Sequence, residues 1–233
     1  MATAALVLAA GRGERLRSGT PKAFVRLAGR SLLCHALEAL AGSPEIDLVV
    51  PVVAASELER FAALAAEWRE IPKLAAPVAG GLERQDSVRA GLASLGPEIT
   101  LVAVHDAARP LVRRDDVSRV VAVARLHGAA LLAVPATDTI KRVRDGLVVE
   151  TPPRKECWVA QTPQAFRVEI LREALAKAEH AGVLGTDDTQ LVERLGVAVQ
   201  VVEGDPGNLK ITRPEDLVLA EALLEARLRR GGA

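Results

Sequence analysis

Short runs of aliphatic residues alternate along the chain with segments whose apolar positions recur at helical spacing. Runs that are apolar on both faces are typical of strands buried in a parallel sheet, and we predict strands at 4–10, 48–53, 99–104, 129–134 and 197–202. The helical pattern predicts helices at 31–41, 57–69, 85–95, 114–127, 168–179, 189–195 and 214–229. This alternation predicts a single α/β domain over residues 1–233, with a Rossmann-like, mostly parallel sheet covered by helices.

The last predicted helix has the clearest start signal. Thr212 and Glu215 have the spacing of a capping box, in which the side chain of each residue accepts the backbone N–H of the other. An apolar stripe then recurs on one helix face: Leu217, Ala220, Leu224 and Leu228. Such a stripe is typical of an amphipathic helix.

Residues 136–160 interrupt the alternation. Asp145-Gly146 lies between two alternating runs, 139–143 and 147–150, and Asp-Gly at such a position is a strong hairpin signal. Because an isolated two-stranded ribbon is marginal in water, this arm needs something to pack against. A second copy of the chain is the partner we expect; the alternative is a hairpin folded onto its own domain.

Composition narrows the class of protein. Nearly half of the residues are apolar, and 30 basic residues balance 30 acidic ones, so bulk charge favours neither nucleic acid nor an acidic membrane surface as a partner. No apolar run approaches the roughly 18 residues that a membrane span needs, and the N-terminus lacks a signal-peptide pattern. Cys34 and Cys157 have neither metal-binding nor disulfide-framework spacing. We expect a globular, cytoplasmic protein in which Cys34 is an inert core residue.

The loop after the first predicted strand is the strongest functional signal. Gly11 and Gly13 let backbone N–H groups approach a ligand and form an anion-binding concavity, and Arg15 and Lys22 add full positive charges. The loop is not a dinucleotide fingerprint, because Leu16 stands at the third glycine, and it is not a P-loop, because a proline precedes the lysine. It predicts a phosphate-chain site, with an ordinary strand-to-helix turn as the alternative.

Two further segments follow predicted strands, and ligands of open α/β sheets bind where strands end. The first segment is 105–110. In it, Asp106 could bind a ribose or polyol hydroxyl or a divalent cation, and Arg109 could bind a phosphate. The alternative is an Asp106–Arg109 ion pair that shapes the loop, and we expect His105 to be structural. The second, 204–210, ends in Lys210, one of only six lysines; the alternative is a plain connection.

Two loops precede predicted helices. The amides of Gly80 and Gly81 and the hydroxyl of Ser87 could bond a nucleobase edge; the alternative is a simple turn in which Ser87 caps the helix. The acidic segment 186–189 fits a helix N-terminus, where carboxylates complement the dipole, better than it fits a metal site.

The chain offers no plausible Ser-His-Asp set, no cysteine nucleophile with a clear base and no zinc spacing. What remains is cations and backbone donors. That inventory suits phosphoryl or nucleotidyl transfer, which depends mainly on positioning and charge neutralisation.

Together these segments resemble the 2-C-methyl-D-erythritol 4-phosphate cytidylyltransferase family of the non-mevalonate isoprenoid pathway. The matching motifs occur in order over nearly the whole chain: Ala9-Ala10-Gly11-x-Gly13-x-Arg15-Leu16 with Pro21-Lys22, Gly80-Gly81-x-x-Arg84-x-x-Ser87-Val88, His105-Asp106-Ala107-Ala108-Arg109-Pro110, Gln161-Thr162-Pro163-Gln164, Thr186-Asp187-Asp188 and Asn208-x-Lys210-x-Thr212-x-Pro214-Glu215-Asp216. Many nucleotidyltransferases share the first motif, whereas the full set is far more specific. One departure is that Ala23-Phe24 follows the lysine, where relatives commonly carry Gln and an aromatic residue; it concerns loop packing.

The resemblance implies a fold of the nucleotide-diphospho-sugar transferase type and an enzyme that uses Mg²⁺. CTP and methylerythritol 4-phosphate would give 4-diphosphocytidyl-2-C-methyl-D-erythritol and pyrophosphate by in-line attack on the α-phosphorus. Arg15 and Lys22 would stabilise the transition state. The resemblance implies a CTP site lined by Ala9, Ala10, Gly11, Gly13, Gly80, Gly81, Ser87, Asp106 and Ala107. It implies an acceptor positioned by Arg154, Lys210, Asp106, Arg109, Thr137 and Thr162, and it assigns no certain metal ligand.

The family is also a homodimer whose arm reaches the partner's site, which implies that Thr137 and Arg154 act in the neighbouring subunit. Two related enzymes remain alternatives: a ribitol 5-phosphate cytidylyltransferase and a sugar-1-phosphate nucleotidyltransferase. Both keep the triphosphate loop and differ in the acceptor pocket. A non-catalytic nucleotide-binding or dimerisation module is a third alternative.

Overall fold

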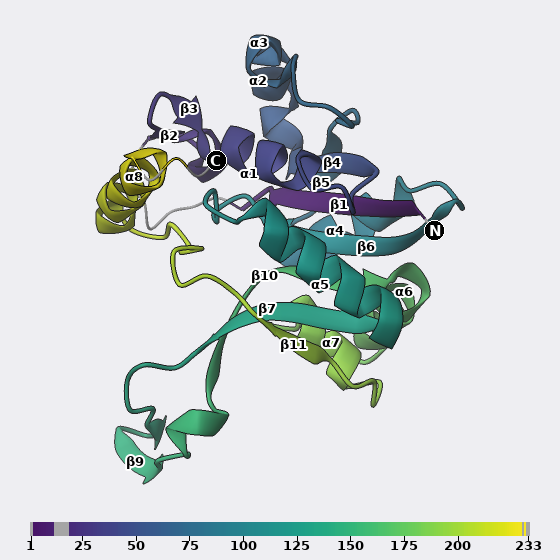
Figure 1. Ribbon diagram of the computed structural model, residues 1–233. Helices are drawn as coiled ribbons and strands as arrows, with labels where there is room; N and C mark the ends of the chain where they lie inside the picture. Colours follow the sequence, from purple (N-terminus) through teal and green to yellow (C-terminus); the bar gives the residue numbers. More distant parts are fainter. Residues whose placement is uncertain (1, 12–18, 230, 232–233) are drawn as a thin grey trace.

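The computed structural model describes residues 2–11, 19–229 and 231. Its centre is a seven-stranded sheet in the order β11-β7-β10-β6-β1-β4-β5 (Figure 1). The pairs are parallel except where β10 runs antiparallel to both β6 and β7. The strands are β1 (Ala2–Ala9), β4 (Leu48–Ala54), β5 (Val78–Gly80), β6 (Ile99–Asp106), β7 (Ala129–Pro135), β10 (Trp158–Arg167) and β11 (Gln200–Glu203). The predicted α/β class with a mostly parallel sheet is therefore confirmed.

Helices cover both faces of this sheet (Figure 1). Side chains alternate between the faces of a strand: in β1, Val7 packs into one core cluster and Leu6 into the other. The first cluster includes residues of α1 (Leu32–Ala41) and α5 (Arg114–His127). The second includes residues of α4 (Arg84–Ala93), α6 (Val168–His180) and α7 (Asp188–Glu193). Burial on both faces explains why these strands read as unbroken apolar runs.

Two predicted elements differ in extent. The helix predicted at 57–69 is a short series, η3 (Ala55–Glu57), α2 (Leu58–Ala63) and α3 (Ala65–Trp68). Inside the series, the Trp68 indole N–H donates to the Phe61 carbonyl oxygen at 2.8 Å, and the two rings stack. The strand predicted at 197–202 is confined to β11.

The sequence pattern did not predict β10, which lies in the interior of the sheet between β6 and β7. Proline removes a ladder donor and is usually found at strand edges or bulges. Here Pro163 lies in an irregular stretch of β10, because the pairing with β7 shifts register between Ala160 and Gln164. Also missed were β5 and a small hairpin of β2 (Arg26–Leu27) and β3 (Arg30–Ser31).

The C-terminal helix α8 (Pro214–Arg229) packs through Ala220 and its neighbours against the segment that carries β2 and β3. The predicted capping box is wrong. Asp216, not Glu215, accepts the backbone N–H groups of Thr212 and Arg213, at 2.7 and 2.8 Å. Of the apolar stripe on this helix, Ala220 is buried, whereas Leu228 is 68% exposed.

The predicted hairpin is present as β8 (Arg142–Arg144) and β9 (Leu147–Glu150), which pair antiparallel in a two-stranded sheet of their own. Asp145 and Gly146 both have positive φ, at +50° and +79°, as a tight hairpin turn requires. We call residues 136–157 the arm; it projects away from the sheet and its helices (Figure 1). Every residue of β8 and β9 is exposed. Among the described residues, no helix has the length and hydropathy needed to cross a membrane.

Candidate functional site

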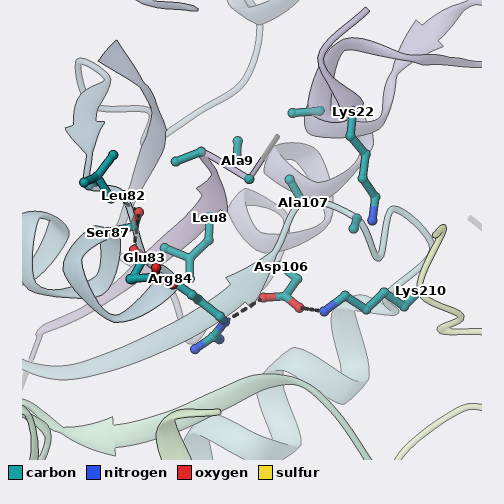
Figure 2. A pocket seen from close by; sticks show the side chains of 15 residues that line it. Leu8, Ala9, Lys22, Leu82, Glu83, Arg84, Ser87, Asp106, Ala107 and Lys210 are labelled. Carbon is teal, nitrogen blue, oxygen red and sulfur yellow. Dashed lines mark hydrogen bonds and ion pairs between the residues drawn. The ribbon is translucent and has the colours of Figure 1, made fainter. Parts of the chain in front are cut away.

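A pocket of about 250 Å³ lies where β1 and β6 end, beside the start of α4 (Figure 2). We call it the first pocket. Because β1 and β6 are parallel, their carboxyl ends meet at one edge of the sheet, the edge at which open α/β sheets bind ligands. It is lined by Leu8, Ala9, Ala10, Gly11, Lys22, Ala23, Gly81, Leu82, Glu83, Arg84, Ser87, Asp106, Ala107, Ala108 and Lys210.

Two glycines allow α4 to begin close to the end of β1. A Cβ on Gly80 would lie 2.7 Å from both the Ala10 Cβ and the Ser87 Oγ, and one on Gly81 would lie 2.3 Å from the Asp86 Cβ. The Gly81 N–H donates to the Ser87 Oγ at 3.2 Å. Side chains at these positions would push α4 away from β1, so the glycines set the width of the pocket.

The helix start itself is capped by other residues than expected. Glu83 and Asp86 form a reciprocal capping box, and the Glu83 N–H donates to Asp86 Oδ2 at 3.2 Å. The alternative in which Ser87 caps α4 is therefore wrong. Ser87 instead receives the Gly81 N–H at the pocket wall.

A buried chain of hydrogen bonds fixes the backbone at Asp106. The Asp106 N–H donates to the Thr162 Oγ1 at 3.0 Å, and this hydroxyl lies 3.0 Å from His105 Nδ1. His105 Nε2 lies 3.1 Å from the Arg109 carbonyl oxygen. Since a carbonyl accepts only, Nε2 carries the proton and Nδ1 accepts from Thr162. Burial lowers the pKa of His105 to about 4, so it is a neutral structural residue, as predicted.

Two cations hold the Asp106 carboxylate from opposite sides (Figure 2). Lys210 Nζ lies 2.7 Å from its Oδ2, and Arg84 Nε lies 3.3 Å from its Oδ1. Burial alone would raise the pKa of Asp106, but Arg84 and Lys210 hold it well below its ordinary value. Asp106 is therefore ionised at neutral pH, with a fixed orientation.

Arg109 does not form an ion pair with this carboxylate, so the alternative of an Asp106–Arg109 ion pair is wrong. Its guanidinium donates instead to the Asn208 and Ala160 carbonyl oxygens, at 2.7 and 3.1 Å. Burial lowers the pKa of Arg109. Asn208 is fully buried, and its amide donates to the Thr162 carbonyl oxygen at 3.0 Å. These bonds tie the 204–210 segment to β10, so it is more than a connecting loop.

A second pocket, of about 480 Å³, adjoins the first through Lys210, which lines both. Its wall is more apolar and comes from the end of β7, from β10 and from the 206–210 segment. The lining residues are Arg109, Val134, Pro135, Thr137, Val159, Gln161, Pro206, Asn208, Leu209 and Lys210.

The structure brings together most of the predicted site residues. Lining the first pocket are Ala9, Ala10, Gly11, Lys22, Gly81, Ser87, Asp106, Ala107 and Lys210. Arg109 and Thr137 line the second pocket with Lys210. Gly80 and Thr162 support the first pocket from behind its lining. Arg154 is exposed on the arm, where it donates to the Thr137 carbonyl oxygen at 3.0 Å. Gly13 and Arg15 lie outside the described residues.

Arg84 is the principal residue that sequence reasoning left without a role. Its guanidinium bridges Asp106 and Asp188, and its Nη1 lies 2.7 Å from Asp188 Oδ2. Burial opposes its charge, but the two carboxylates raise the pKa of Arg84 above its ordinary value. The predicted capping by the 186–189 segment is confirmed at Asp187, whose side chain accepts the Gln190 N–H.

The described residues hold no group of three or more His, Cys, Asp and Glu placed to enclose a metal ion. Mg²⁺ commonly needs no such cage, because one or two carboxylates and the substrate's phosphates hold it. The first pocket supplies two carboxylate side chains, Asp106 and Glu83. Glu83 caps α4, so Asp106 is the residue whose chemistry fits a phosphate-bound Mg²⁺.

Comparisons with known proteins point to a single family over nearly the whole chain. Residues 3–226 match the sequence profile described as 2-C-methyl-D-erythritol 4-phosphate cytidylyltransferase. A protein of that name from Pelotomaculum thermopropionicum is 47% identical over 225 residues, 96% of this chain and 94% of the relative. One from Geobacter metallireducens is 43% identical, over 98% of this chain and all of the relative.

Solved structures give the same result. The crystal structure of 4-diphosphocytidyl-2C-methyl-D-erythritol synthase from Anaerococcus prevotii is similar with a TM-score of 0.86 and 29% identity, covering 96% of each chain. The 2-C-methyl-D-erythritol 4-phosphate cytidylyltransferase from Thermus thermophilus has a TM-score of 0.76 and 37% identity, covering 96% of this chain and 98% of that one.

Proposed function

Because the chain belongs to the 2-C-methyl-D-erythritol 4-phosphate cytidylyltransferase family, we propose that the two adjoining pockets are its nucleotide and acceptor sites. The protein joins CTP to 2-C-methyl-D-erythritol 4-phosphate, giving 4-diphosphocytidyl-2-C-methyl-D-erythritol and pyrophosphate. The observation that carries the assignment of sites is Lys210, which lines both pockets and pairs with Asp106.

In this proposal CTP occupies the first pocket. Its base lies near Gly81 and Ser87, and its phosphates lie near the end of β1 and Lys22. The acceptor phosphate oxygen is already ionised at neutral pH, so the reaction needs no general base, and the neutral, buried His105 is not one. The task is to bring one polyanion to the α-phosphorus of another, and cations fixed beforehand do this by neutralising charge that builds in the transition state.

The acceptor occupies the second pocket. Its phosphate meets Lys210 and Arg109, and its carbon chain meets the more apolar wall between Val134 and Val159. Thr137 lies at the same wall. In this proposal, the attacking oxygen lies on the side of Lys210 that faces the nucleotide pocket.

We propose Mg²⁺ as the metal, with Asp106 as the protein group that holds it together with the phosphates of CTP. When bound, Mg²⁺ neutralises phosphate charge and assists the departure of pyrophosphate. Asp106 suits this role because it is ionised and held in one orientation.

We also propose a homodimer formed through the arm. Support comes from the apolar side chains that β8 and β9 expose, among them Val143, Leu147 and Val148, which are 55%, 72% and 59% exposed. An exposed apolar ribbon of this kind is typical of an interaction surface. That Thr137 and Arg154 act in the partner subunit's site, and that the protein is cytoplasmic, stay predictions.

An acceptor-panel assay tests the proposed reaction. The purified protein is incubated with CTP and Mg²⁺, and pyrophosphate release is measured with methylerythritol 4-phosphate, ribitol 5-phosphate or a sugar 1-phosphate. We expect release with methylerythritol 4-phosphate alone, and none after chelation of the metal by EDTA. Release with ribitol 5-phosphate would favour that alternative, and CTP binding with no release for any acceptor would indicate a binding module.

A further inference from the structure

Asp188 is a buried carboxylate outside both pockets, and the reaction described above gives it no task. Its side chain is 1% exposed. Its backbone N–H donates to the Gln164 Oε1 at 3.1 Å, and Gln164, on β10, is itself 1% exposed. Helix capping does not explain the carboxylate, because Asp187 performs it. The Asp188 side chain instead forms a 2.7 Å ion pair with Arg84.

Arg84 therefore stands between two carboxylates. It reaches Asp188 through Nη1 at 2.7 Å and Asp106 through Nε at 3.3 Å. The shorter contact is to the residue behind the pocket, so the guanidinium is held toward the wall. Only one of its nitrogens reaches Asp106, on Oδ1, which leaves Oδ2 to Lys210.

We infer that Asp188 is a positioning residue of the acceptor site, acting through Arg84 on the Asp106–Lys210 pair. This rests on the proposed function. With Asp188 in place, Arg84 divides its charge between two carboxylates, and Lys210 keeps Asp106 as its counter-ion between the two pockets. Without the Asp188 charge, Asp106 is the one carboxylate of the described residues that still pairs with Arg84, and arginine–carboxylate pairs are frequently bidentate. Lys210 then loses its counter-ion and its fixed place in the wall of the second pocket.

The geometry predicts where the effect is felt. Lys210 lines both pockets, but the proposed function gives it the acceptor phosphate to hold. The base of CTP is assigned to Gly81 and Ser87, which take no part in the ion pairs that Arg84 forms with the two carboxylates. Loss of the Asp188 charge should therefore weaken binding of the acceptor more than binding of CTP.

The test is a double-mutant cycle in the full-length protein, with Asp188→Asn, Arg84→Gln and the double variant. We expect Asp188→Asn to raise the KM for methylerythritol 4-phosphate at least about tenfold, a coupling typical of residues in one ion-pair network, with the KM for CTP changed less than about twofold. In the Arg84→Gln background, the same substitution should change the acceptor KM less than about twofold. Asp187→Asn, which keeps a good capping residue, is the matched control and should leave both KM values unchanged.

A merely structural role for Asp188 gives a different result: a lower kcat from a smaller folded fraction, unchanged KM values and an equal loss in both backgrounds. That result would overturn the inference. If Asp188→Asn does not fold, Arg84→Lys replaces it, because a lysine keeps the charge but cannot span two carboxylates; it must raise the acceptor KM by a similar factor. Wild-type turnover is measured first, so a failure of the proposed reaction is seen separately from a failure of this inference.

Discussion

The carboxyl edge of the sheet and the arm are built in opposite ways. At the edge, ionised side chains are buried or half-buried and held by partners from distant parts of the same chain, such as Asp106 with Arg84 and Lys210. In the arm, apolar side chains are exposed and local pairing between β8 and β9 holds them together. In the first arrangement, the described partners of Asp106 belong to the same chain. The second leaves apolar surface exposed, and this exposed surface is the support for the homodimer proposed above.

The largest effect is expected at the carboxyl edge of the sheet, from the loss of a charged residue of the first pocket. Lys22→Ala should lower kcat at least about a hundredfold, because removal of one preorganised hydrogen-bond donor typically raises the activation free energy by about 2.7–4 kcal/mol. Turnover is measured at saturating CTP. Lys177→Ala, on the exposed face of α6, removes the same charge elsewhere and should have no effect. A turnover near wild type in Lys22→Ala would remove this lysine from the transition state.

The next largest effect is expected in the arm, from a charge placed among its exposed apolar residues. Val148→Asp places a charge on the exposed ribbon, and burying that charge in an interface is costly, so the dimer dissociation constant should rise at least about tenfold. Analytical ultracentrifugation measures it. Val218→Asp is the control, since Val218 is also exposed, at 69%, but lies on α8. Equal dissociation in both variants, or none in either, would exclude the arm as the interface.

A third prediction concerns the buried support beneath the site. The pKa of His105 is about 4 in the folded protein and about 6.5 in an unfolded chain, so the unfolded state takes up the proton first as pH falls. Stability contributed by the neutral ring is therefore present above about pH 6.5 and lost progressively toward pH 4, by up to about 3 kcal/mol. Urea unfolding between pH 7 and 4 measures this loss. His105→Asn, which cannot titrate, should lose less over the same interval; an identical pH dependence would contradict the assignment.

The smallest effect is expected on the stability of the start of α8. Asp216→Ala removes the carboxylate that accepts two backbone N–H groups before α8, and should lower the free energy of unfolding by about 1 kcal/mol. Glu215→Ala is the neighbouring control and should cost much less. Both are measured by urea unfolding. The reverse order would restore the capping box that the sequence pattern indicates.

The parts of the fold that follow from local pattern were predictable. Strands such as β1 and β6 are apolar on both faces, and Asp145-Gly146 determines the arm's turn by its backbone conformation alone. By contrast, β10 depends on tertiary pairing with β6 and β7 and tolerates Pro163 through its irregular pairing. No local rule contains that information.

The site divides in the same way. Lys22, Asp106 and Lys210 follow glycine-containing or strand-end segments, and their convergence follows from a parallel sheet. Arg84 gives no such signal, because an arginine at the start of a helix usually faces solvent. Its two carboxylate partners lie 22 and 104 residues away, so its role emerges only when the chain is folded.

The arm also differs from an ordinary surface hairpin in where it is rooted. It leaves the sheet from β7 and returns through β10, and these two strands pair with each other in the interior of the sheet. Thr162, whose hydroxyl accepts the Asp106 N–H, belongs to the returning strand. In the proposed dimer, a partner that holds the tip of the arm would therefore also restrain the two strands that lead to Thr162 and Asp106.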